Sequence, residues 1–152
     1  MKEVIEEQMV RARPFPKSIN STLTMRANRA KNTGPELSLR KSLREAGVTG
    51  YRLHWSKAPG KPDIAFPGKK IAVFVNGCFW HRCSRCNLPI PIHNRKYWIQ
   101  KLQRNVKKDK KYLSQLMKLG WKSVVTWECM IKEDIESCRD IVLEVLEGND
   151  RD

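Results

Sequence analysis

The chain has 152 residues, of which 30 are Lys or Arg and 16 are Asp or Glu, so its formal net charge is +14. This length suffices for the core of one domain, and the 40% hydrophobic content excludes a disordered acidic tail. No apolar run approaches the roughly 18 residues of a membrane span, and residues 1–17 lack the apolar segment of a secretory signal. We therefore expect a cytoplasmic protein without a membrane partner. The charge exceeds the roughly 2–8 that suffices for solubility, which predicts a polyanion partner but leaves DNA, RNA and anionic lipid open.

The chain divides into an N-terminal arm over residues 1–19, a domain over 20–148 and a short tail over 149–152. Pro14 and Pro16 interrupt the arm, which has few apolar residues. We expect at most a short helix followed by a loose strap in this segment.

Hydrophobic periodicity and turn residues predict an α/β domain with a mixed sheet flanked by helices. A capping box begins the first helix at Thr33, and Gly47 ends it. The segment 71–75 is an unbroken apolar run, which is typical of a central strand buried on both faces, and it forms a hairpin with 63–66. The other expected elements are a strand over 51–54, a helix over 95–119, a strand over 121–127 and a helix over 135–148. On the long helix, the expected buried stripe comprises Trp98, Leu102, Val106, Leu113 and Met117, widened by Ile99 and Leu116.

Five cysteines without a secretory signal argue against a disulfide framework and favour a metal site. Cys83 and Cys86 have the spacing of a zinc knuckle, while Cys78 and Cys129 each follow a predicted strand. If those strands are neighbours, the four thiolates can bind one structural Zn²⁺. The alternatives are that Cys78 and Cys129 are small buried residues, or that His81 or His93 replaces one ligand. Cys138 lies on the apolar stripe of the last helix and is expected in the core.

A carboxylate, Asp63, stands at the start of a predicted strand after the turn 59–62. Together with the central strand, it resembles the hairpin of PD-(D/E)xK nucleases, whose fold resembles that of restriction endonucleases. Phosphodiester hydrolysis requires a hard cation and a base that activates water, and such a hairpin can supply both. Taken alone, Asp63 is better explained as a turn residue.

Residues 75–81, with the sequence VNGCFWH, resemble the signature of the very short patch repair (Vsr) endonucleases. The resemblance extends from about residue 20 to about residue 146, most of the chain. Its other pieces occur in the family's order and include Met25-Arg26, Lys31-Asn32-Thr33, Pro35-Glu36, Gly60-Lys61-Pro62-Asp63, Tyr97-Trp98, Lys101, Asn105, Asp109, Gly120-Trp121 and Trp127-Glu128-Cys129.

The resemblance implies roles for the matching residues. Asp63 binds catalytic Mg²⁺ together with the main-chain carbonyl of Val75, and Glu36 hydrogen-bonds water around the metal. His81 is the general base, and Asp109 orients it. Many relatives have His or Asp at the position of Asn76, whose amide hydrogen-bonds but does not titrate. Some relatives also have His where this chain has Cys83, and a thiolate is a suitable substitute.

The resemblance also implies how DNA is held. Phe79 and Trp80 intercalate at a mismatch, although packing against the cysteine loop is the alternative. Met25 enters from the opposite groove, and Arg26 contacts the DNA backbone or minor groove. Lys101 and Asn105 reach the edges of the mismatched bases. The spacing of Lys101, Arg104, Lys108 and Lys111 places them on one face of the long helix, which suits phosphate contact or a solvated surface.

These expectations combine into a Mg²⁺-dependent nicking endonuclease that acts on T·G mismatches and cuts the T strand 5′ to the T. Such mismatches arise when 5-methylcytosine deaminates. We expect a monomer associated with the bacterial nucleoid, with other mismatch-repair proteins as candidate partners. The alternatives are a restriction-type or defence nuclease of related fold and a zinc-stabilised DNA-binding module without catalysis.

Overall fold

A computed structural model of the chain describes residues 31–150. The expectations for the arm (1–19), Met25 and Arg26 lie outside the described residues. The described elements are α3 (Gly34–Glu45), β1 (Arg52–Leu53), β2 (Ile64–Phe66), the 3₁₀ helix η1 (Pro67–Lys69), β3 (Ile71–Asn76), α4 (Arg95–Lys118), β4 (Lys122–Trp127), α5 (Glu128–Glu133) and α6 (Ile135–Asn149).

The described strands form one mixed sheet in the order β1-β2-β3-β4. β2 and β3 pair antiparallel, which confirms the predicted hairpin, and β3 pairs parallel with β4 from Ile71↔Lys122 to Asn76↔Trp127. β3 is central and almost wholly buried, as its apolar run predicts. Because β3 and β4 are parallel, the residues that follow Asn76 and Trp127 leave the same edge of the sheet.

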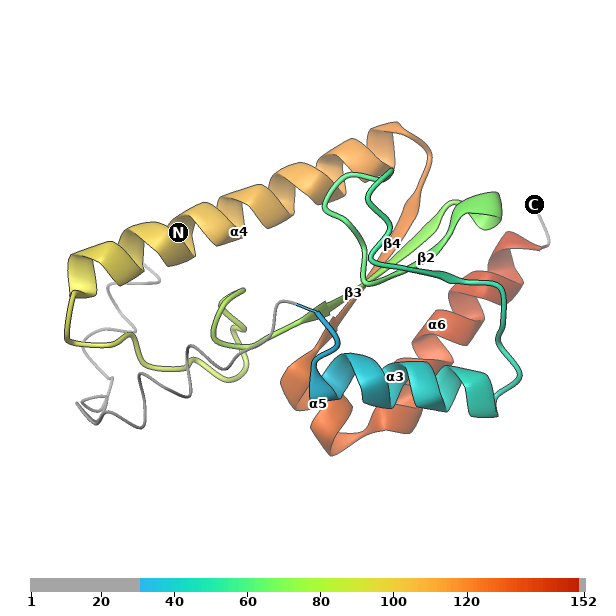
Figure 1. Ribbon diagram of the computed structural model, residues 1–152, viewed down its shortest axis with the longest axis horizontal. Helices are drawn as coiled ribbons and strands as arrows, with labels where there is room; N and C mark the ends of the chain where they lie inside the picture. Colours follow the sequence, from blue (N-terminus) through green and yellow to red (C-terminus); the bar gives the residue numbers. More distant parts are fainter. Residues whose placement is uncertain (1–30, 151–152) are drawn as a thin grey trace.

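Helices cover both faces of this sheet. Figure 1 shows α3, α5 and α6 together on one side and the long α4 on the other. The core on the first side joins Leu39 and Leu43 of α3 to Ile71 and Val73 of β3 and to Val142 of α6. The fold is therefore the mixed α/β arrangement that the sequence predicts, with one additional short helix, α5, between β4 and α6.

The long helix buries the predicted face except at one position, Met117. Leu102 and Leu116 are fully buried, whereas Met117 is 71% exposed, so its expected place on the buried stripe is wrong. Successive residues of an α-helix point about 100° apart, so Leu116 and Met117 cannot both face the sheet. Leu116 packs with Ala72 of β3, and Leu102 packs with Ile90 beyond the sheet. The N-terminal half of α4 therefore packs on the loop that contains Ile90, and its C-terminal half packs on β3.

The caps of α3 agree with the sequence, with one change. The Thr33 hydroxyl accepts from the N–H of Glu36 at 3.4 Å, as in a capping box. The Glu36 carboxylate reaches back one residue further than expected and accepts from the N–H of Asn32 at 3.1 Å. Gly47 follows the helix with φ of 85°, as predicted for its end.

None of the helices within residues 31–150 combines the length and apolar character needed to cross a membrane.

We predict that Gly60→Ala destabilises the fold by about 1–3 kcal/mol. Gly60 has φ of 79°, and a Cβ there would lie 3.0 Å from Cβ of Tyr112 and 3.2 Å from Cε1 of Phe74. Gly68→Ala is the matched control, since a Cβ at Gly68 meets nothing within 4 Å. Urea denaturation measures both. Equal stabilities of the two variants would show that the tight approach at Gly60 does not constrain the turn before Asp63.

Candidate active site

An open cleft of about 1240 Å³ lies where the carboxyl ends of β3 and β4 meet the start of α3 and the middle of α4. It brings together every residue predicted to take part in catalysis. These are Glu36 from α3, Asp63 before β2, Val75 and Asn76 at the end of β3, His81 in the following loop and Asp109 on α4.

Asp63 is held by the neighbouring strand. Its Oδ2 accepts from the N–H of Val75 at 2.7 Å, and Oδ1 has no hydrogen-bond partner within residues 31–150. Burial, together with the negative charge of Glu36, raises the pKa of Asp63 from 3.8 to about 6, against the opposing effects of the Val75 N–H, His81 and Arg40. The nearby positive charges do not offset the burial of this carboxylate, and a bound cation would add to them.

His81 and Asp109 form a hydrogen-bonded pair across the cleft. Nδ1 of His81 lies 2.6 Å from Oδ2 of Asp109, and each side chain is about one third exposed. The backbone N–H of His81 donates to the carbonyl of Gly77 at 3.1 Å, which fixes the loop after β3. With Nδ1 donating to Asp109, Nε2 carries the lone pair and can accept a proton from water.

Glu36 is buried on the other side of Asp63, with only 3% of its surface exposed. Its Oε2 accepts from the N–H of Asn32, lies 3.5 Å from the Arg40 guanidinium and lies 3.7 Å from Nε2 of His54. One ligand atom each of Glu36, His54 and Asp63 lie within 4.8 Å of one another. His54 was not predicted as a site residue, although its position shortly before the turn that leads to Asp63 was a usable signal.

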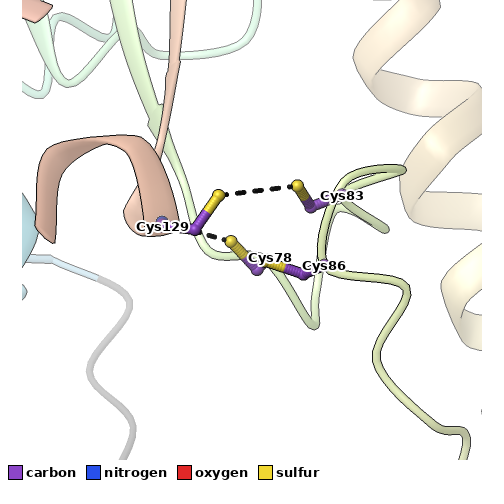
Figure 2. Close-up of side chains that lie close together, drawn as sticks. All are labelled: Cys78, Cys83, Cys86 and Cys129. Carbon is purple, nitrogen blue, oxygen red and sulfur yellow. Dashed lines mark hydrogen bonds between the residues drawn. The ribbon is translucent and has the colours of Figure 1, made fainter. Parts of the chain in front are cut away.

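Four cysteines converge beside the cleft, at the edge of the sheet (Figure 2). The Sγ atoms of Cys78, Cys83, Cys86 and Cys129 all lie within 4.8 Å of one another, and this cluster includes neither His81 nor His93. Cys129 comes from the start of α5, and the other three come from the loop after β3. Burial raises the pKa of Cys78 and Cys86, whereas for Cys83 the N–H groups of Cys86 and Arg85 and the thiols of Cys129 and Cys86 together outweigh burial and lower the pKa. Four converging thiols, one of them favouring the thiolate, are a suitable donor set for zinc.

Aromatic rings gather at one end of the cleft, against the N-terminal half of α4. We call Phe79, Trp80, Tyr97 and Trp98 the aromatic group. The ring centroids of Phe79, Trp80 and Trp98 lie 5.1–5.8 Å apart in pairs. Trp98 was predicted on the buried stripe and as part of the family resemblance, but its contact with Trp80 was not predicted.

The two polar α4 residues predicted to read bases border this aromatic group. Nζ of Lys101 lies 5.3–5.6 Å from the ring centroids of Trp80, Tyr97 and Trp98. Nδ2 of Asn105 donates to the carbonyl of Trp80 at 3.2 Å. These contacts tie the loop after β3 to α4.

Known proteins resemble this chain. Residues 16–88 match the family model described as DNA mismatch endonuclease Vsr. A Type II nicking enzyme of Xanthomonas oryzae, V.XorIIP, is 36% identical over 110 residues, which are 72% of this chain and 79% of the relative. A second one, V.NaeI of Lentzea aerocolonigenes, is 36% identical over 138 residues, 88% of this chain and 80% of the relative. The DNA mismatch endonuclease Vsr of Escherichia coli is 31% identical over 108 residues, 71% of this chain and 69% of the relative.

The chain belongs to the Vsr family. It is a DNA endonuclease, and DNA is its substrate. Vsr membership confirms the resemblance drawn from residues 75–81. It also selects DNA from the polyanions that the charge left open, and it indicates the use of a divalent metal.

For this Vsr-family enzyme, we predict that Asp63→Asn stabilises the fold in buffer without added divalent cations. The pKa of Asp63 is higher in the folded chain than the ordinary 3.8, so ionisation opposes folding. The free energy of unfolding of the wild type falls as the pH rises from 3.8 to about 6. Above that pH the variant gains up to about 3 kcal/mol, and the gain disappears in acid.

Asp140→Asn, at an exposed carboxylate beside Arg139, is the control for this experiment and should change stability by less than about 0.5 kcal/mol. Urea denaturation at pH 4, 6 and 8 measures the three proteins. A gain for Asp63→Asn that is the same at every pH would show that burial of the charge is not its cause.

Proposed function

We propose that the protein is a Mg²⁺-dependent nicking endonuclease that recognises T·G mismatches and cuts the T strand 5′ to the T. The observation that carries the proposal is the cleft itself, where a desolvated Asp63 lies with the His81–Asp109 pair beside a partly exposed aromatic group. The name of the Escherichia coli relative specifies a DNA mismatch, and the names of the other two specify nicking. We also propose that the hairpin β2–β3 is a core of the PD-(D/E)xK type.

Asp63 and the main-chain carbonyl of Val75 would hold the Mg²⁺. The donor set fits, since Asp63 Oδ1 and Glu36 Oε1 have no hydrogen-bond partner among residues 31–150, and carboxylate oxygens suit this hard cation. When bound, Mg²⁺ supplies positive charge against the phosphate that is cleaved. Asn76 donates or accepts hydrogen bonds at the end of β3, while Glu36 orients water from α3.

His81 takes the proton from the attacking water through Nε2. Asp109 holds Nδ1 of the ring and stabilises the positive charge that the imidazole acquires. The two residues come from different elements, so the pair forms only when α4 packs against the loop after β3.

The aromatic group is the surface that would enter the DNA. Phe79 and Trp80 insert at the mismatched pair, because a weakened pair lowers the cost of unstacking, which is a few kcal/mol per step. Lys101 and Asn105 lie beside these rings and would contact base edges. Met25 and Arg26 complete the DNA contacts from the segment before α3.

We propose that the four cysteines bind one structural Zn²⁺. Cys129 on α5 and the other three on the loop after β3 would then be joined at a single point. The same loop carries Phe79, Trp80 and His81, so the zinc site would fix the positions of these three residues relative to the sheet. We further propose that the enzyme is monomeric and works at the bacterial nucleoid, with other mismatch-repair proteins as partners.

The deciding experiment uses end-labelled duplexes that differ only in carrying T·G, T·A or C·G. We expect the wild type to produce a single nick 5′ to the T of the T·G duplex, and only with Mg²⁺. Asp63→Ala should abolish the nick, while Asp140→Ala, at an exposed carboxylate, should retain it. Equal cutting of all three duplexes would support the restriction-type nuclease instead. Binding without cutting by the wild type would support the non-catalytic module.

Zinc loading gives a second test. Purified wild type should contain about one zinc per chain by elemental analysis. Cys78→Ser should lose the metal and part of its thermal stability, whereas Cys138→Ala, at a buried cysteine of α6 outside the cluster, should keep the metal. Full zinc content in Cys78→Ser would contradict the four-cysteine site.

A further inference from the structure

Three polar residues contact the Glu36 carboxylate, and none of them has a role in the mechanism proposed above. We call Asn32, Arg40 and His54 the Glu36 clamp. Nη2 of Arg40 donates to Oδ1 of Asn32 at 2.6 Å and lies 3.5 Å from Oε2 of Glu36. Nε2 of His54 lies 3.4 Å from the same Asn32 oxygen and 3.7 Å from Glu36 Oε2. The backbone N–H of Asn32 donates to Glu36 Oε2.

All of these contacts fall on one of the two carboxylate oxygens. Oε2 of Glu36 faces the whole clamp, while Oε1 has no hydrogen-bond partner within residues 31–150. The two oxygens of Asp63 differ in the same way: Oδ2 accepts from the Val75 N–H, and Oδ1 has no hydrogen-bond partner within residues 31–150. The terminal torsion of a glutamate is soft, so without partners on one oxygen the carboxylate could rotate. The clamp removes this freedom.

The charge in the clamp is buried. Arg40 is 9% exposed and Glu36 is 3% exposed. A buried ion pair of this kind adds little net stability, since desolvation offsets the attraction, and an apolar residue could fill the same space. Arginine has a further property that packing does not need: its guanidinium is planar and always charged. Here Nη2 of Arg40 donates to Oδ1 of Asn32 and lies 3.5 Å from Oε2 of Glu36, so one nitrogen links the side chain of Asn32 to the carboxylate.

We propose that Arg40 and Asn32 are positioning residues of the metal site: they hold Glu36 by Oε2, so that its carboxylate is presented to the divalent cation bound at Asp63. This inference rests on the proposed function, because it assumes a cation at Asp63. Its support is the closeness of Glu36, His54 and Asp63, whose ligand atoms lie within 4.8 Å of one another. Neither positioning residue needs to touch the DNA or the cation.

Metal binding is measured first, without DNA and without turnover. Mn²⁺ replaces Mg²⁺, and the loss of its free electron paramagnetic resonance signal is followed as zinc-loaded protein is added. We expect wild type to bind Mn²⁺ and Asp63→Asn to lose this binding, which identifies the titrated site. Arg40→Gln should weaken Mn²⁺ binding about 10-fold to 100-fold, as is typical when a partner of a metal-site carboxylate is removed. Arg44→Gln, one turn further along α3 and exposed, should bind like wild type.

Asn32 offers a variant that separates side chain from backbone. Its φ is 55°, a region that glycine adopts freely, so Asn32→Gly removes Oδ1 without backbone strain. Asn32→Asp retains an oxygen for Arg40 and His54. We expect Asn32→Gly to weaken Mn²⁺ binding and Asn32→Asp to bind more tightly than Asn32→Gly. The Mg²⁺ concentration for half-maximal nicking should follow the same order, with the affinity for duplex in Mg²⁺-free buffer unchanged.

Wild-type Mn²⁺ affinity in both Arg40→Gln and Asn32→Gly would overturn the inference. If circular dichroism shows that Arg40→Gln does not fold, Asn32→Gly decides alone, because Asn32 is exposed. The proposed function fails separately, when wild type does not prefer the T·G duplex. In that case the Mn²⁺ titration still tests whether the clamp supports a cation at Asp63.

Discussion

The parallel pairing of β3 with β4 is the constraint on which the rest of the structure depends. It aligns Asn76 with Trp127, so the two chain segments that follow leave the sheet side by side. One segment begins the loop that carries Cys78, Phe79, Trp80 and His81, and the other begins α5 with Cys129. A parallel pair requires a long crossover, and α4 is that crossover. The same helix supplies Asp109 to His81 and Trp98 to the aromatic group. The sheet topology therefore brings together the cysteine cluster, the His81–Asp109 pair and the aromatic group.

The net positive charge of the chain does not extend to the floor of the cleft, which is acidic. The chain carries +14, yet the floor of the cleft holds Asp63 and Glu36, with Arg40 as the buried cation beside Glu36. Exposed Arg104, Lys108 and Lys111 lie along α4, and under the proposed function long-range attraction would draw DNA to this surface. At the cleft itself the field favours a cation over a phosphate. Under the proposed function, attraction of DNA and binding of the metal would therefore depend on different residues, and substitutions would separate the two.

The sequence predicted most of the fold because its signals are local. The apolar run 71–75, the capping box at Thr33 and Gly47 are read from neighbouring residues, and each element that they predict is present. The sequence predicted less well which side chains are buried, because that depends on how the elements pack together. Met117 fits a helical stripe as well as Leu116 does, and only the position of the sheet selects Leu116. The Glu36 clamp joins residues 32, 40 and 54 through side-chain contacts, and the periodicity of the sequence does not predict such contacts. In the candidate site, the motif 75–81 identified His81 and Cys78, and cysteine spacing identified the other three thiols of the cluster. The contacts of Trp98 with Trp80 and of His54 with Glu36 depend on how α4 and the segment after β1 pack.

Substrate-dependent metal capture follows from these features under the proposed mechanism. Asp63 is desolvated enough for its pKa to rise to about 6, and Glu36 adds a second negative charge nearby. A DNA phosphate entering the same cleft adds a third, which is unfavourable in a partly water-excluded site. A divalent cation removes this conflict, because it attracts both carboxylates and the phosphate together. The phosphate in turn raises the affinity for the cation, since the two binding events are linked and the coupling is reciprocal. The free enzyme should therefore bind its catalytic metal less tightly than the DNA complex does, while metal binding at the cysteine cluster, which makes no contact with phosphate in this scheme, should not depend on DNA.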